Sequence, residues 1–264
     1  MFKIFNLTIC FCIAVCLQAK DSTRRLPDPP TTIYRNAALI GLSYARHMPL
    51  SDMKVRFGNS NTFGLAGGYK FGKKNWIISG GADIIFSSNV NENTMFDTIT
   101  GPSGSMIDAQ GNLAVVRLYE RGYHFHFDFG RVFPLNRIHT NSGIVFTEGV
   151  GFLQHKVKFL YTRTIMPQLE KNIYKGYDRL SNGLMLRVFL GYQRMEPDEL
   201  FSFYAGIEYL RGFTRNRREL NYDTRTQDTR LRKDELVGIK IGVLIPILGR
   251  KAGTKKGEEE KYFE

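Results

Sequence analysis

Apolar and polar residues alternate with a period of two through most of the chain. Residues 123–129 read Tyr-His-Phe-His-Phe-Asp-Phe, so the aromatic side chains share one face of a strand, and His124, His126 and Asp128 share the other. Residues 237–245 repeat the pattern, with β-branched side chains at every odd position. Comparable alternation covers 38–45, 63–70, 76–86, 143–161, 184–193 and 201–210. We therefore predict an all-β protein with eight strands.

The connections between these strands alternate in length, which is typical of an antiparallel up-and-down barrel whose two rims face different compartments. Long connections at 46–61, 87–112, 162–179 and 214–233 alternate with short ones at 71–75, 134–142 and 195–199. Short extra strands within the long connections would raise the number to ten. Glu148 has the parity of its apolar neighbours, so we expect a bulge or a change of register within 143–161.

The two faces of the predicted strands differ in the size of their side chains. One face carries Phe, Tyr, Ile, Leu and Val, whereas the other carries Gly, Ala and Ser with scattered charges of both signs. Small residues suit a narrow interior and large apolar ones suit lipid, so we predict a transmembrane β-barrel without an open pore. The expected interior polar network is Lys70, Asp83, His124, His126, Asp128, Arg187, Glu208 and Lys240. A soluble lipocalin-like barrel that binds a small apolar ligand is the alternative, and it would invert these faces.

The N-terminal segment is typical of an exported protein. Lys3 precedes an apolar run that is too short to span a bilayer and ends in small residues, which indicates a signal peptide. The three cysteines, Cys10, Cys12 and Cys16, all lie in that segment, so we expect no thiolate site in the mature chain. The predicted organisation is a signal peptide at 1–19, a periplasmic leader at 20–36, the barrel at 37–248 and a charged tail at 249–264.

The chain is basic, with 37 Lys and Arg against 25 Asp and Glu and a formal net charge of +12. Much of the excess lies in the connection 214–233, whose predicted surface basic residues are Arg215, Arg217, Arg218, Arg225, Arg230 and Arg232. If the long loops are extracellular, these guanidinium groups either face lipid A phosphates or form a solvated loop. The charges lie on a strand connection without helical or base-stacking motifs, so we expect no nucleic-acid partner.

His124, His126 and Asp128 share a strand face and are candidates for a metal site or a general base. A hydrogen-bond network in the lumen explains the same residues, and we predict no metal, no cofactor and no catalytic residue. A lipid A-modifying enzyme is a further alternative, and it needs a histidine that faces lipid. The parity of His124 and His126 argues against it, because the aromatics that alternate with them are expected to face lipid.

Three segments carry a resemblance to a known group of proteins: Gly-Phe-Leu-Gln-His-Lys at 151–156, Lys-Gly-Tyr-Asp-Arg-Leu-Ser-Asn-Gly at 175–183 and Gly-Tyr-Gln at 191–193. From Ala38 to Pro246 the chain resembles the small OmpX-like and OmpA-like outer-membrane barrels, and it looks most similar to uncharacterised barrels of the Bacteroidota. The resemblance implies the fold and an outer-membrane location, with no catalytic residue. It departs from many such barrels in the tail after the last strand.

The function that these observations favour is structural or a binding platform. We expect loops 87–112, 162–179 and 214–233 to act at the cell surface, towards lipopolysaccharide and outer-membrane lipid or a protein partner. A role as an accessory subunit of a secretion or assembly complex is compatible with this hypothesis. The soluble ligand-binding barrel and the lipid A-modifying enzyme stay as alternatives.

Overall fold

The computed structural model describes residues 36–72, 74–92, 95–97, 99–100, 106–135, 141–161, 165–170, 173–195 and 202–248. The predicted signal peptide, the leader up to residue 35 and the charged tail lie outside these residues. Within the described part, no helix is long and apolar enough to cross a membrane.

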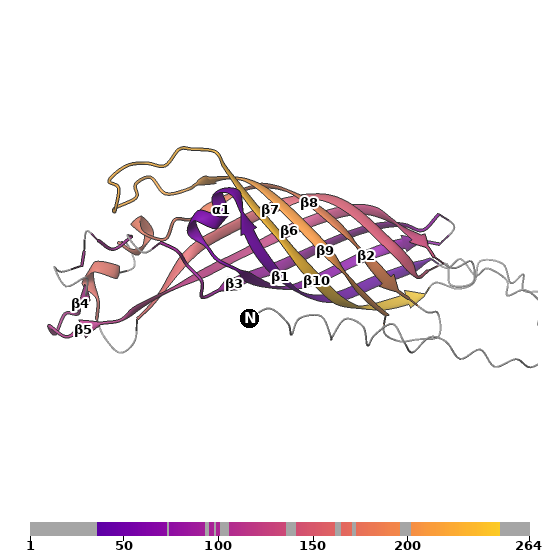
Figure 1. The fold of residues 1–264 in the computed structure, drawn as a ribbon, viewed down its shortest axis with the longest axis horizontal. Coiled ribbons are helices and arrows are strands. Elements are labelled where there is room, and N and C mark those ends of the chain that lie inside the picture. Colours follow the sequence, from indigo (N-terminus) through magenta and orange to yellow (C-terminus); the bar gives the residue numbers. More distant parts are fainter. Residues whose placement is uncertain are drawn as a thin grey trace, which may run out of the picture. The chain divides into compact units, whose positions relative to one another are not determined.

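Eight antiparallel strands close into a barrel in the ring order β1-β10-β9-β8-β7-β6-β3-β2 (Figure 1). The barrel strands are β1 (Ala37–Leu50), β2 (Ser60–Phe71), β3 (Trp76–Ser87), β6 (Val116–Pro134), β7 (Gly143–Tyr161), β8 (Ser181–Arg194), β9 (Ser202–Asn216) and β10 (Arg232–Leu248). β4 (Met106–Ile107) and β5 (Leu113–Ala114) form a separate two-stranded sheet. The predicted up-and-down barrel is confirmed with eight strands, and the two extra strands lie outside the ring.

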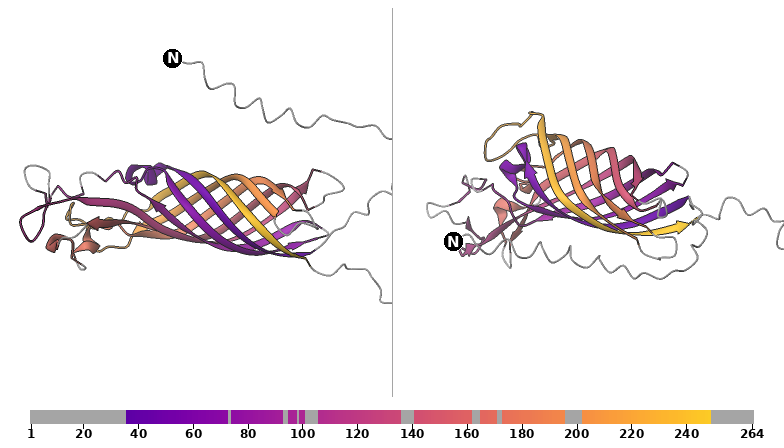
Figure 2. Two further views of the ribbon diagram at one scale, coloured as in Figure 1. Left: turned by 90° about the horizontal axis from the view of Figure 1, so that it is seen from below. Right: turned by 45° about the vertical axis from the view of Figure 1, so that its right-hand side comes forward.

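The long connections gather at one end of the barrel, the loop end, and the short connections at the other, the turn end. β1 begins and β10 ends at the turn end, whereas helix α1 (Ser51–Arg56) and the β4–β5 hairpin lie at the loop end (Figures 1 and 2). The short helical turns η1 (Pro167–Leu169) and η2 (Tyr174–Gly176) belong to the connection between β7 and β8. β1 runs on to Leu50 and β2 starts at Ser60, so the first long connection is shorter than predicted.

The outward face of the barrel is an exposed apolar surface. Leu65, Phe127 and Ile239 are 57%, 58% and 67% exposed, on three different strands. A closed barrel leaves no unpaired strand edge, and large apolar side chains on its outside need a lipid environment. This is the architecture of an outer-membrane barrel. The lipocalin-like alternative is wrong, because it requires a polar outer face around an apolar interior.

The expected bulge near Glu148 is absent. β6 and β7 pair without interruption from Pro134–Gly143 to Val116–Tyr161, and Glu148 lies opposite Phe129 on the outward face. A bulge at this position would shift the faces of all later residues of β7, which alternate correctly without one. The uninterrupted register leaves the carboxyl group of Glu148 on the outward face of β7. An acidic residue on the lipid side costs less than the ~2–4 kcal/mol that a lysine or arginine costs at the membrane midplane.

Buried apolar clusters lie in the lumen towards both ends of the barrel, on either side of the layer of charged side chains that is described below. The cluster on the loop side combines inward barrel residues with loop residues: Met53, Phe57, Ile85, Met95, Phe96, Met106, Leu153, Val157, Phe159, Met166, Leu169, Tyr177, Met185, Leu210 and Leu236. The cluster on the turn side is smaller: Ile77, Val132, Val145 and Phe189. The long connections therefore pack into the mouth of the barrel and help to seal it.

Candidate functional site: the polar layer of the lumen and the loop end

Charged side chains from five strands meet in the middle of the lumen. Lys240 on β10 donates from Nζ to Asp83 Oδ1 on β3 at 3.0 Å and to Glu208 Oε1 on β9 at 3.1 Å. Arg187 on β8 donates to Glu208 Oε1 and, through Nη1, to Asp128 Oδ2 on β6, each at 2.7 Å. Two of these four bonds, Lys240 to Asp83 and Arg187 to Asp128, join strands that are not neighbours in the ring. The polar layer therefore crosses the lumen and ties the walls together.

Two histidines on β6 extend this layer. His126 lies between two carboxylates, with Nδ1 2.7 Å from Asp128 Oδ2 and Nε2 3.1 Å from Asp83 Oδ2. His124 Nδ1 is 3.7 Å from the same Oδ2 of Asp83, and neither of its nitrogens has a hydrogen-bond partner among the described residues. Seven of the eight predicted network residues are thus together: Asp83, His124, His126, Asp128, Arg187, Glu208 and Lys240.

Lys70, the eighth predicted residue, lies apart from the polar layer. Its Nζ donates to Asn75 Oδ1 at 2.7 Å and to Asn141 Oδ1 at 2.8 Å near the turn end. Asp83 pairs with Gly64, six positions before Lys70 on β2, which corresponds to ~20 Å along a strand. Shared inward parity therefore does not bring the two side chains to the same depth.

His47 is a member of the polar layer that the sequence prediction missed. Its Nε2 lies 2.8 Å from Glu208 Oε2, and both side chains are fully buried. The prediction ended the first strand at Ala45 and placed His47 in a loop. The alternation of the first strand could have indicated this position. Every second residue from Leu39 to Ala45 faces inward, and His47 is the next residue in that series.

Glycines on neighbouring strands give the carboxylates room. A Cβ on Gly64 would lie 2.1 Å from Asp83 Oδ1, and one on Gly149 would lie 2.2 Å from Asp128 Oδ1. A cavity of about 90 Å³ adjoins the layer and is lined in part by Asp83, His126 and Asp128. Its size corresponds to roughly three water molecules. The small residues on the inward face therefore make space for buried charges and solvent.

Four of the six predicted basic residues have polar partners at the loop end. Arg218 donates to Asp178 at 2.8 Å, Arg230 to Asp52 at 2.9 Å, and Arg217 to Asn182. Arg232 is buried on the inward face of β10 and donates to the backbone oxygen of Asp52 at 2.9 Å. Arg215 and Arg225 are exposed. The six guanidinium groups therefore do not form one free cationic patch.

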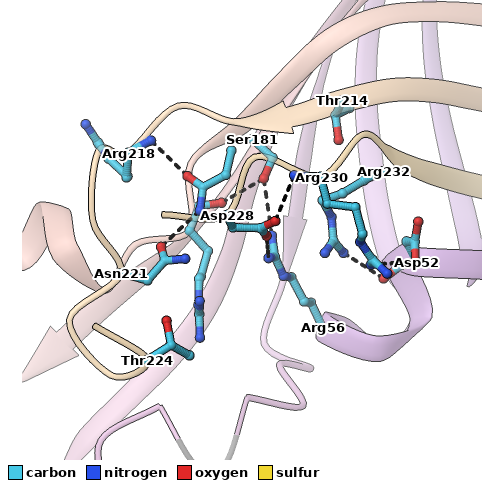
Figure 3. A network of polar contacts seen from close by, with 12 residues as sticks. Asp52, Arg56, Ser181, Thr214, Arg218, Asn221, Thr224, Asp228, Arg230 and Arg232 are labelled. Atoms are coloured by element: carbon cyan, nitrogen blue, oxygen red, sulfur yellow. Dashed lines mark hydrogen bonds and ion pairs between the residues drawn. The ribbon is translucent and has the colours of Figure 1, made fainter. Parts of the chain in front are cut away.

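Arg56 on α1 connects the loops to one another (Figure 3). Its guanidinium is 3.2 Å from Ser181 Oγ, 3.3 Å from Asp228 Oδ2 and 3.3 Å from Glu92 Oε1. Arg179 pairs with Glu92 at 3.9 Å and with Asp223. Burial lowers the pKa of Arg56 to about 10, so it stays charged at neutral pH and depends on these carboxylates. Its place in a predicted strand connection gave no sign of this role.

A separate group of cations lies on the outward face of the β6–β7 hairpin, beyond the apolar belt towards the loop end. We call Arg117, Arg121, Lys156 and Lys158 the hairpin cation cluster. Arg121 pairs with Lys156 in the ladder, and Tyr119 pairs with Lys158. Arg117 and Lys158 are exposed, whereas Arg121 and Lys156 are half-buried. These strand residues face outward and do not belong to the predicted basic loop.

Comparisons with known proteins give solved outer-membrane barrels of low sequence identity. No family model matches the chain, and no curated protein matches it. Ail of Yersinia pestis, solved with the heparin analogue sucrose octasulfate, is 14% identical, with 80% of this chain and 99% of that chain covered and a TM-score of 0.40. Neisserial surface protein A is 12% identical, with coverages of 79% and 96% and a TM-score of 0.38. OprG from Pseudomonas aeruginosa is 14% identical, with coverages of 81% and 97% and a TM-score of 0.36.

Proposed function

We propose that this outer-membrane barrel is a sealed scaffold that binds lipid A phosphates on its outward face and offers its loop end to a further partner. The observation that carries the proposal is the hairpin cation cluster. On β7 the outward residues change from apolar at Phe152 to polar at Gln154 and basic at Lys156. This change marks the boundary where the phosphates of an outer leaflet would lie.

The chemistry of the hairpin cation cluster suits a phosphate group. Arginine binds phosphate through two parallel N–H donors, and lysine contributes a mobile point charge. Tyr119 and Tyr123 accompany the cations on β6, and the outward positions from residue 117 to 123 and from 154 to 160 carry no acid. An amphipathic aromatic belt at the headgroup level is common in membrane barrels.

The test is binding of purified lipid A to the detergent-folded barrel, measured by native mass spectrometry. Replacing both Arg117 and Lys158 with Gln should weaken binding at least tenfold, because each cation near an anionic surface contributes ~1 kcal/mol. The matched control is Arg215→Gln with Arg225→Gln, which removes the same charge from the predicted basic loop. We expect that control to bind lipid A like the wild type.

Lipid A without phosphates separates phosphate recognition from acyl-chain contact. It should bind the wild type and the Arg117/Lys158 variant equally. Equal loss in the two charge variants would show a general charge effect, and unchanged binding in the Arg117/Lys158 variant would exclude the cluster as the phosphate site.

The ordered loop end supports a platform role. Arg56 and Arg179 join residues from different connections, and Tyr177 is buried in the apolar cluster beneath them. We propose a non-enzymatic role, and the inward direction of His124 and His126 supports it, since a lipid A-modifying enzyme needs a histidine at the lipid surface. A protein partner, an accessory role in secretion or assembly, and the closeness to Bacteroidota barrels stay predictions.

A further inference from the structure

Asp83, His124 and His126 form a compact group of metal-ligating side chains in the lumen. One ligand atom from each lies within 4.8 Å of the others. Asp83 Oδ2 is 3.1 Å from His126 Nε2 and 3.7 Å from His124 Nδ1. Tetrahedral zinc, with bonds of about 2.0–2.1 Å to nitrogen, separates its ligands by roughly 3.3 Å. We propose that these three residues bind a divalent transition-metal ion such as Zn²⁺.

The surroundings of His126 orient it as a ligand. Its Nδ1 is 2.7 Å from Asp128 Oδ2, so a proton on Nδ1 leaves the Nε2 lone pair directed towards Asp83. Metal-binding histidines usually have such a carboxylate on the nitrogen that does not bind the metal. Arg187 Nη1 donates to the same Oδ2 of Asp128 at 2.7 Å. The second ring nitrogen of His126 is therefore available to a cation.

His124 gives the second, independent indication of a ligand. The side chain is fully buried, and both ring nitrogens lack a hydrogen-bond partner among the described residues. A buried histidine without a partner is unusual, because its polar atoms lose water and gain nothing. A metal ion between His124, His126 and Asp83 would satisfy one of these nitrogens.

The charge and the open space around the three ligands also favour a cation. Among the residues that the structure describes, the carboxylates Asp83, Asp128 and Glu208 pair with two side chains that are cationic at neutral pH, Lys240 and Arg187. Lys240 contacts Oδ1 of Asp83, which leaves Oδ2 on the histidine side. The adjoining cavity touches Asp83 and His126, so a water molecule has room to supply a fourth ligand.

The test uses Co²⁺ as the probe, because its visible absorption reports the coordination number and zinc displaces it from nitrogen and oxygen sites. The detergent-folded barrel is loaded either during refolding or afterwards, dialysed, and analysed for bound metal. We expect one Co²⁺ per chain, with the spectrum of a low-coordinate site that disappears on addition of Zn²⁺. His124→Gln should weaken binding at least tenfold, a loss comparable to the effect of disturbing a metal site's supporting residues.

The matched control is His155→Gln. His155 is also a fully buried histidine, 2.8 Å from Asp234, but it belongs to no cluster of three ligands in the described part of the chain. This variant should bind Co²⁺ like the wild type. A heat-shift gel checks that each variant folds, and Asp83→Asn replaces His124→Gln if the latter does not. Failure of the wild type to retain Co²⁺ under both loading conditions, or equal affinity in wild type and folded ligand variant, would overturn the proposal.

Discussion

Replacing Glu208 with Gln is expected to lower the free energy of unfolding by ~3–5 kcal/mol, the usual cost of removing one partner from a buried ion pair. Glu208 accepts hydrogen bonds from Lys240 and Arg187 and lies 2.8 Å from His47. The neutral amide removes the carboxylate that Lys240 and Arg187 share, so each of these buried cations loses one anionic partner. Urea unfolding of the barrel in lipid vesicles, followed by tryptophan fluorescence, measures the change.

The control for this prediction is Glu235→Gln. Glu235 faces outward on β10 and pairs with the partly exposed Arg211 at 3.4 Å, so its loss should cost only ~0–1 kcal/mol. Removing a cation together with the carboxylate, in the double variant Glu208→Gln and Lys240→Met, should recover part of the stability. Equal destabilisation by the two Glu→Gln variants would contradict the role that we assign to the polar layer.

Replacing Arg56 with Met should release the loop end while leaving the barrel closed. Arg56 holds Asp228 of one connection, Glu92 of another and Ser181 at the start of β8. Loss of a buried arginine that binds carboxylates should lower the free energy of opening the loop end by ~2 kcal/mol or more. Trypsin should then cleave the opened connection about thirtyfold faster. Limited trypsin digestion measures it, because the connection 217–231 contains arginines at four positions that the enzyme can cut.

Lys54→Met is the matched control for Arg56→Met, since Lys54 is on the same helix but exposed. Its cleavage pattern should equal that of the wild type. The heat-shift gel should be unchanged in both variants, because the hydrogen-bonded ladder does not depend on α1. A wild-type cleavage rate in Arg56→Met would show that other contacts hold the loops.

The barrel and its two faces could be predicted because alternation is a local property. In 123–129 and 237–245 the alternation of residue types alone shows which side chains point inward and which point outward. The other barrel strands show the same kind of alternation. Glu148 shows the limit of this reasoning, since a single polar residue on the apolar face looks like a register change. The energy of one exposed carboxyl group is smaller than the cost of disrupting the long β6–β7 ladder.

The contacts within the site depend on depth and on distant segments, which local patterns do not contain. Parity places Lys70 and Asp83 on the same face, but only the register of β2 against β3 shows that they lie far apart. Likewise, the number of arginines in 214–233 does not show that Asp52 and Asp178 from other connections neutralise two of them. The inward position of His47 could have been predicted from the sequence, because His47 continues the alternation of the first strand.

We expect the large apolar side chains to face lipid and the charged layer to lie inside the barrel. The most direct test places a single tryptophan on either face, with the native Trp76 replaced by Phe, in vesicles that contain brominated lipid. Phe127→Trp should be strongly quenched, because Phe127 is 58% exposed on the outward face, whereas Phe189→Trp should be protected, because Phe189 is 3% exposed inside the lumen. Strong quenching at position 189 with protection at position 127 would mean that the faces are inverted.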